Sequence, residues 1–138
     1  MMSCLIDTNV WIRYFAKDDL RQFEECDRFF DQVEMGSVAP YVSNVTLMEI
    51  LYTLKSYYGF SKEKIAHYLK TIMGTRNLVI LEKTNSRLAF EKTIKVGVKY
   101  TDCLIAGQLK RNMVLVSFDR DFDRLVPGIR KEPGDLVK

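Results

Sequence analysis

The stretch CLIDTNVWI at residues 4–12 decides the fold, because a short apolar run ends at an acid and leads directly into a helix-like apolar pattern. Four short runs rich in β-forming residues occur in the chain, at residues 3–6, 38–42, 78–81 and 113–117. Their starts lie 35, 40 and 35 residues apart, which suits crossovers through helices and excludes hairpins. The pattern predicts an α/β fold with a parallel β-sheet of about four to five strands flanked by helices on both faces.

Helical patterns fill the gaps at residues 19–35, 45–58, 62–73 and 86–96, and a further helix is expected to open at Thr101 or Asp102. Each start carries an oxygen-bearing side chain that can cap free backbone N–H groups. A short helical turn near residues 122–125 and a last edge strand near residues 129–131 complete the expected order. We expect one domain over residues 1–138.

Composition excludes several classes of protein. Of 138 residues, 47% are hydrophobic and 28% charged, so a compact soluble domain is expected rather than a disordered chain. The apolar runs fall far short of the ~20 residues that span a bilayer, and the first residues lack the pattern of a signal peptide. A cytoplasmic protein without membrane contact is therefore expected. Three irregularly spaced cysteines and one histidine argue against a disulfide framework and a zinc site built on several histidines.

Acidic side chains stand where strands end and helices begin. Asp7 follows the first apolar run and Asp119 follows the run at residues 113–117, while Asp102 opens an apolar helix. In open parallel sheets, ligands bind at the carboxyl ends of the strands, so these acids are candidates for one site. The alternative is that each acid only caps a helix or closes a turn, and the sequence leaves that alternative open.

Glu49 is harder to explain as a surface residue. It is the only charge in the segment VTLMEILYTL at residues 45–54, which predicts a helix that is buried on nearly all sides. At helical spacing Glu49 lies opposite a face made by Leu47, Leu51 and Leu54. A buried unpaired carboxylate is costly, so we expect a partner from another part of the chain. The alternative is a glutamate that reaches solvent from a partly exposed flank.

A cation would stabilise all four acids together. Two carboxylates 4 Å apart repel by about 4 kcal/mol at an effective dielectric constant of 20, and oxygen donors alone favour Mg²⁺ or Mn²⁺ over zinc. The net charge is +3, and setting four of the 18 acidic residues aside leaves 14 acids against 21 basic residues. A basic body around an acidic, metal-binding pocket is expected of a protein that cuts a polyanion. Arg13 and Arg120 are the candidates for phosphate contacts, with a solvated surface role as the alternative.

Four segments of the chain resemble, in order and spacing, the signature segments of the PIN domain. They are DTN at residues 7–9, Glu49 within its apolar helix, YTDCLIA at residues 100–106 and LVSFDRDF at residues 115–122. The resemblance implies a metal-dependent ribonuclease that uses Mg²⁺ or Mn²⁺ and acts on RNA. Small members of the family are commonly VapC-type toxins held inactive by an antitoxin protein, and the resemblance also implies a homodimer.

The resemblance assigns roles to individual positions. Asp7, Glu49 and Asp102 match the three most regular acidic ligands of the family, and Asp119 matches the fourth. Ser117 stands where the family often has threonine, which keeps the hydroxyl. Supporting roles fall to Asn9, which can hydrogen-bond a ligand carboxylate or water, and to Asp121, which either shares the work of Asp119 or packs beside Phe122.

Three rival functions stay open at the level of sequence. The first is a PIN nuclease that processes RNA and is not a toxin. The second is a phosphatase with a strand-end aspartate as nucleophile, although such enzymes usually have a second aspartate at the position of Asn9. The third is a binding domain without catalysis whose helix caps imitate the motif, and the isolated Glu49 argues against it.

Overall fold

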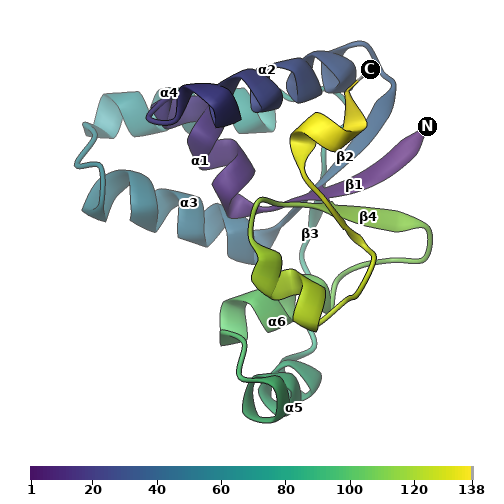
Figure 1. The fold of residues 1–138 in the computed structure, drawn as a ribbon. Helices are drawn as coiled ribbons and strands as arrows, with labels where there is room; N and C mark the ends of the chain where they lie inside the picture. Colours follow the sequence, from purple (N-terminus) through teal and green to yellow (C-terminus); the bar gives the residue numbers. More distant parts are fainter. Residues whose placement is uncertain (138) are drawn as a thin grey trace.

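The computed structural model describes residues 1–137 and confirms the predicted alternation of strands and helices (Figure 1). The strands are β1 (Met2–Ile6), β2 (Val38–Ser43), β3 (Val79–Leu81), β4 (Met113–Val116) and β5 (Arg130–Lys131). The α-helices are α1 (Thr8–Ala16), α2 (Leu20–Glu34), α3 (Asn44–Ser56), α4 (Lys62–Met73), α5 (Ser86–Val96) and α6 (Tyr100–Ala106). Two 3-10 helices follow near the end, η1 (Arg120–Arg124) and η2 (Pro133–Leu136).

The strands form one parallel sheet in the order β3-β2-β1-β4-β5. Strand β1 is central, and its Cys4 lies opposite Pro40 of β2 on one side and Val114 of β4 on the other. The chain runs outward from β1 through β2 to β3, then returns to the other side of β1 for β4 and β5. The direction of winding therefore changes between β1 and β4, which is where open α/β sheets form a ligand crevice at the carboxyl edge.

Two hydrophobic cores cover the two faces of the sheet, as the sequence predicts. Side chains alternate along a strand, so Cys4 and Ile6 enter one core and Leu5 enters the other. The first core contains Trp11 and other residues of α1, α2, α3 and α4, and the second contains Ile105 and other residues of α5 and α6. Figure 1 shows α5 and α6 on the opposite side of the sheet from α1 and α2.

The prediction that this helix is buried on nearly all sides is wrong for α3. Ile50 and Leu54 are fully buried, but Leu51 is 42% exposed and Tyr52 is 71% exposed. The error has a physical cause: the segment is apolar all round, so periodicity alone cannot say which side the sheet will cover.

Helix α6 begins at Tyr100, one residue earlier than expected. Its N-cap residue is therefore Lys99, and the side chain of Lys99 makes no capping hydrogen bond. Asp102 lies within the first turn of α6 and is 3% exposed. This shift removes Asp102 from the capping position and turns its carboxylate toward the carboxyl edge of the sheet.

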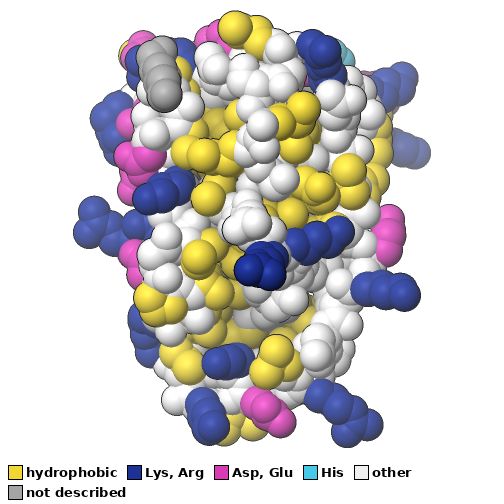
Figure 2. Space-filling view, turned by 90° about the vertical axis from the view of Figure 1, so that its right-hand side faces the viewer, with side chains coloured by type: hydrophobic (Ala, Val, Ile, Leu, Met, Phe, Trp, Pro, Cys, Tyr) yellow, Lys and Arg dark blue, Asp and Glu magenta, His cyan; other side chains and the backbone are white. Residues whose placement is uncertain are grey.

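The opposite edge, at the amino ends of the strands, has a different surface. Figure 2 shows this side of the molecule, where lysine and arginine outnumber acidic side chains and lie between hydrophobic ones. The acids discussed above belong to the other edge of the sheet. Within residues 1–137, no helix is long and apolar enough to cross a membrane.

The orientation of α3 generates a stability prediction. Replacing Ile50 by alanine removes fully buried apolar volume and should lower the free energy of unfolding by about 2–4 kcal/mol. Replacing its neighbour Leu51 should cost under about 1 kcal/mol, because much of that side chain already faces solvent. Urea unfolding of Ile50→Ala and Leu51→Ala compares them directly. Equal losses would show that α3 is turned differently.

Candidate active site

A cleft of about 400 Å³ opens at the carboxyl edge of the sheet. It lies at the ends of β1 and β4 and takes side chains from α1, α3 and α6 as well. All four acids singled out from the sequence line it. The lining residues are Asp7, Thr8, Asn9, Ile12, Arg13, Asp18, Glu49, Thr53, Tyr57, Tyr58, Lys99, Asp102 and Asp119.

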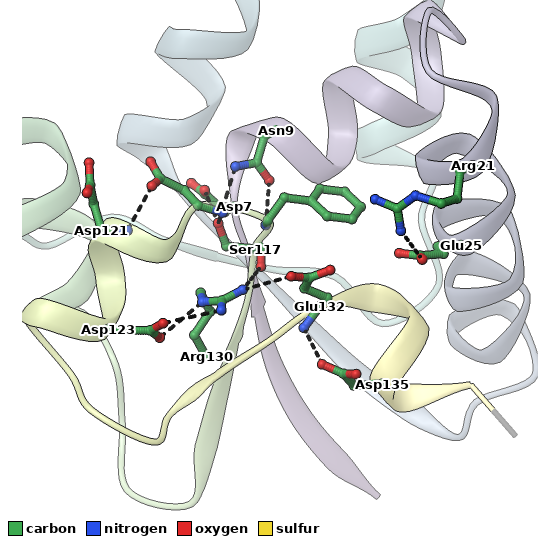
Figure 3. Close-up of polar contacts among 12 residues, drawn as sticks. Asp7, Asn9, Arg21, Glu25, Ser117, Asp121, Asp123, Arg130, Glu132 and Asp135 are labelled. Carbon is green, nitrogen blue, oxygen red and sulfur yellow. Dashed lines mark hydrogen bonds and ion pairs between the residues drawn. The ribbon is translucent and has the colours of Figure 1, made fainter.

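Asp7 is held at the floor of the cleft by Ser117. The backbone N–H of Asp7 donates to the carbonyl of Val116 at 2.9 Å, which continues the pairing of β1 with β4 by one residue. The Ser117 hydroxyl donates to Asp7 Oδ2 at 2.7 Å and accepts hydrogen bonds from Asn9 Nδ2 and from the backbone N–H of Asp119 (Figure 3). Because Ser117 is completely buried, this hydroxyl orients Asp7 without competition from water.

Arg130 supports Ser117 from behind the site. Its guanidinium donates to the carbonyl oxygen of Ser117 at 3.0 Å and pairs with Asp123 and Glu132 (Figure 3). Only 12% of the Arg130 side chain is exposed. The sequence analysis missed this residue, because its partner is known only once β5 is placed beside β4.

Glu49 finds its partner in α1. The hydroxyl of Thr8 donates to Glu49 Oε1 at 2.7 Å. This contact confirms the expectation that the carboxylate is paired from elsewhere in the chain, although the partner is a neutral hydroxyl and leaves the negative charge in place. Glu49 is half-buried at the wall of the cleft.

Asp102 is the least satisfied acid of the site. Its Oδ2 atom is buried and has no hydrogen-bond partner in residues 1–137. The nearest positive charge is the ammonium of Lys99, 3.8 Å from Oδ2. Lys99 is not among the residues singled out from the sequence, although its i, i+3 spacing from Asp102 is a signal that could have found it.

Burial and mutual repulsion raise the pKa of two carboxyls. Burial raises the pKa of Asp7 to about 6, with the charges of Glu49 and Asp119 adding to the effect and the Ser117 hydrogen bond opposing it. Burial also raises the pKa of Asp102 to about 7, opposed by Lys99 and assisted by the other three acids. Both carboxyls are therefore costly to ionise in the chain alone, which is typical of functional sites.

The capping alternative holds for only one of the strand-end acids. Asp7 occupies the N-cap position of α1 but makes no capping hydrogen bond, and Asp102 is not a cap residue. Asp119 does cap η1, because its Oδ1 accepts from the backbone N–H of Asp121 at 2.9 Å. Asp121 itself is exposed and does not line the cleft.

The two arginines proposed for phosphate contacts are placed differently. Arg13 lines the cleft, but its guanidinium is held by Asp18 at 2.9 Å and by the Tyr58 hydroxyl at 3.3 Å. Arg120 is exposed and does not line the cleft. Arg13 is therefore anchored through one guanidinium nitrogen, whereas Lys99 lines the cleft and pairs with Asp102.

The donor set suits a hard divalent ion, although the ligands are not gathered around one point. No group of three or more His, Cys, Asp or Glu side chains in residues 1–137 is arranged to hold an ion as these side chains stand. Magnesium usually keeps several waters and binds protein through one or two carboxylates, so a closed cage is not required. The unpartnered Oδ2 of Asp102 is the atom that such an ion would satisfy.

A small parallel α/β sheet with acids at its switch point defines a class of α/β domains with a ligand site at the carboxyl edge of the sheet, and comparison with known proteins identifies the family. The chain belongs to the PIN domain family, whose model matches residues 4–126. It is 24% identical over 123 residues to a VapC ribonuclease from Aquifex aeolicus (strain VF5), covering 88% of this chain and 90% of the relative. These similarities agree with the VapC-type resemblance read from the sequence.

Solved structures share the fold. A chain in the crystal structure of VapBC2 from Rickettsia felis bound to a DNA fragment from their promoter superposes with a TM-score of 0.67 and 16% identity, over 95% of this chain and 98% of that one. PAE2754 from Pyrobaculum aerophilum gives a TM-score of 0.67 and 17% identity, over 98% of this chain and 92% of that one. At these identities the likeness establishes the α/β PIN fold alone.

The raised pKa values generate a pH prediction for the metal-free protein. Between the ordinary aspartate pKa of 3.8 and the raised values of Asp7 and Asp102, the folded chain holds more protons than the unfolded chain. Stability contributed by these groups is therefore complete below pH 4 and is lost as the pH rises through about 6 and 7. We expect urea unfolding in EDTA to give a lower free energy of unfolding at pH 8 than at pH 5.

Asp102→Asn tests the origin of this loss. The neutral side chain should raise the free energy of unfolding at pH 8 in EDTA by roughly 2–4 kcal/mol and flatten its pH dependence. Asp31→Asn, on the exposed side of α2, is the control. It should change neither the free energy of unfolding at pH 8 nor its dependence on pH. A variant less stable than the wild type at pH 8 would contradict the electrostatic account.

Proposed function

We propose that this protein is a divalent-metal-dependent endoribonuclease and the toxin component of a toxin–antitoxin pair. The observation that carries the proposal is the gathering of Asp7, Glu49, Asp102 and Asp119 in one cleft at the switch point of the sheet, with one buried carboxylate oxygen unpartnered. Membership of the PIN domain family and the similarity to a VapC ribonuclease support it.

Each acid has a role in the proposed site. Asp7 and Asp102 are the buried ligands of Mg²⁺ or Mn²⁺, while Glu49 and Asp119, at the half-buried wall, hold ligand waters or complete the coordination. A divalent ion bound there supplies positive charge that activates water and stabilises charge developing on the scissile phosphate. Ser117 and Asn9 hold Asp7 in place, and Thr8 orients Glu49.

The rival enzyme class fits the geometry less well. A phosphatase with Asp7 as nucleophile needs an acid at the position of Asn9 to protonate the leaving group. The Asn9 amide instead donates to Ser117 and accepts from the backbone N–H of Phe118 at 3.2 Å, so both ends of this side chain are used in the structure. An amide has no acidic proton to supply. The site therefore favours metal-assisted attack by water.

A domain without catalysis is also disfavoured. Helix capping would explain acids at these positions at little cost, but Asp7 and Asp102 cap nothing and are almost completely buried. Burying ionisable groups next to one another lowers the free energy of unfolding, and a binding scaffold gains nothing from that loss. A metal site explains why the chain tolerates this cost.

The proposal predicts RNA cleavage that requires metal. Purified protein with Mg²⁺ or Mn²⁺ should cut RNA internally, and EDTA should stop the reaction. Asp7→Asn should lower the cleavage rate by more than about 100-fold, because a ligand of the activating ion is lost. Gel analysis of end-labelled RNA measures both effects.

Two comparisons make this test specific. Asp31→Asn, which changes the charge equally at a remote surface, should keep full activity, and Asp7→Asn should remain folded by circular dichroism. Cleavage that persists in EDTA would contradict the metal mechanism. Rapid hydrolysis of an aryl phosphate with no action on RNA would reverse the ranking in favour of the phosphatase.

The toxin role predicts growth arrest in cells. Expression of the wild type should stop growth, and the Asp7→Asn variant should not. Coexpression of a small protein encoded beside this chain should restore growth and copurify with it, as expected of an antitoxin. A wild type that is harmless in several hosts would favour the alternative of an RNA-processing nuclease. Sedimentation of the purified chain tests the homodimer that we propose from family resemblance.

A further inference from the structure

The cleft contains two cations in unlike situations. Arg13 has hydrogen bonds to Asp18 and Tyr58, which hold its guanidinium against the wall. Lys99 donates no hydrogen bond within residues 1–137, and its side chain is 62% exposed. Its ammonium lies 3.8 Å from Asp102 Oδ2. Lys99 is thus the cation of the cleft whose charged group is not anchored by a hydrogen bond.

The position of Lys99 is not explained by helix capping. N-cap positions favour Ser, Thr, Asp and Asn, whose side chains accept hydrogen bonds from the first backbone N–H groups. Lysine has no acceptor, and Lys99 makes no capping bond. The side chain instead reaches the one buried carboxylate oxygen of the site that has no hydrogen-bond partner. This partner, Asp102, lies three residues further on in the first turn of the same helix, so the ion pair is a local one that also faces the cleft.

We propose that Lys99 is an exchangeable cation of the site: it neutralises Asp102 in the metal-free chain and contacts a phosphate oxygen of the RNA once a divalent ion binds Asp102. This inference rests on the proposed function. The ammonium stays protonated throughout, so no bond to it forms or breaks.

The exchange follows from like charges competing for one atom. Asp102 Oδ2 is the contact of Lys99 and also the unpartnered atom that an ion would satisfy. A divalent ion on that oxygen repels the ammonium. The flexible four-carbon stem of lysine then lets the ammonium turn toward the mouth of the cleft, where a bound phosphate would lie. Arg13 is anchored through Nη1 to Asp18 and Tyr58, so its guanidinium is less free to move than the ammonium of Lys99.

The first experiment measures metal binding without RNA. Lys99→Met keeps the length of the side chain and removes its charge, so calorimetric titration with Mn²⁺ should show binding about 2- to 5-fold tighter than in the wild type, the range expected for losing an exposed ion pair. Lys95→Met, in the last turn of α5 and outside the cleft, should bind Mn²⁺ as the wild type does. Unchanged affinity in Lys99→Met would overturn the exchange.

The second experiment measures contact with RNA phosphate. In an Asp7→Asn background with Mn²⁺ at a concentration that saturates this variant, Lys99→Met should lower the slope of log affinity against log salt for a single-stranded RNA by about 0.7, the value for one lost phosphate contact. Lys95→Met should leave the slope unchanged. With Asp7 intact, Lys99→Met should lower kcat/KM for RNA by about 10- to 100-fold, as for a lost hydrogen bond to a charged group, and Lys99→Arg should restore most of it.

The outcomes separate this proposal from the proposed function. Tighter Mn²⁺ binding with unchanged salt slope and unchanged kcat/KM would make Lys99 only a counter-ion of Asp102 and overturn its role toward RNA. A wild type that cuts no RNA would refute the ribonuclease itself. In that case the Mn²⁺ affinity and the salt slope still decide Lys99, because neither requires cleavage, and no change in either would overturn the proposal.

Discussion

The parallel pairing of β1 with β4 is the constraint on which the rest of the structure depends. One backbone hydrogen bond, from Asp7 to Val116, carries this pairing past the end of β1 and sets Asp7 beside Ser117. The two residues are 110 positions apart in the chain. Because the winding of the sheet reverses between these strands, no crossover covers their carboxyl ends, and the gap becomes the cleft.

Electrostatics makes this cleft different from the rest of the core. Asp7 and Asp102 are nearly inaccessible to water, and their pKa values are raised because burial and the neighbouring acids disfavour charge. Lys99 offsets part of this cost from a largely exposed position. A divalent cation bound here would therefore offset the repulsion among the acids and raise the stability of the folded chain. Functional sites commonly lower the stability of the protein that contains them.

Support for the site comes from a series of hydrogen bonds that ends on Asp7. Arg130 binds the Ser117 carbonyl, Ser117 binds Asp7, and Asn9 ties the same hydroxyl to α1. Each link joins a different element, so the position of Asp7 depends on β5, β4 and α1 together. Such supporting hydrogen bonds limit the motion of the Asp7 carboxylate, as is expected where a functional group must be placed precisely.

The sequence by itself determined the α/β class and the four acids, three of them near strand ends or helix starts and Glu49 within an apolar helix, because these follow from local periodicity and from side-chain chemistry. It could not choose the buried side of α3, since an all-apolar helix has no preferred face until the sheet selects one. It also could not find Arg130, whose partner is fixed by the pairing of β5 with β4. The pairing of Lys99 with Asp102 is local, but the place of that pair in the cleft is fixed by the packing of α6. The local sequence pattern identifies the charged groups, but only the tertiary structure decides which of them are buried together. That shared desolvation gives the cleft its chemistry.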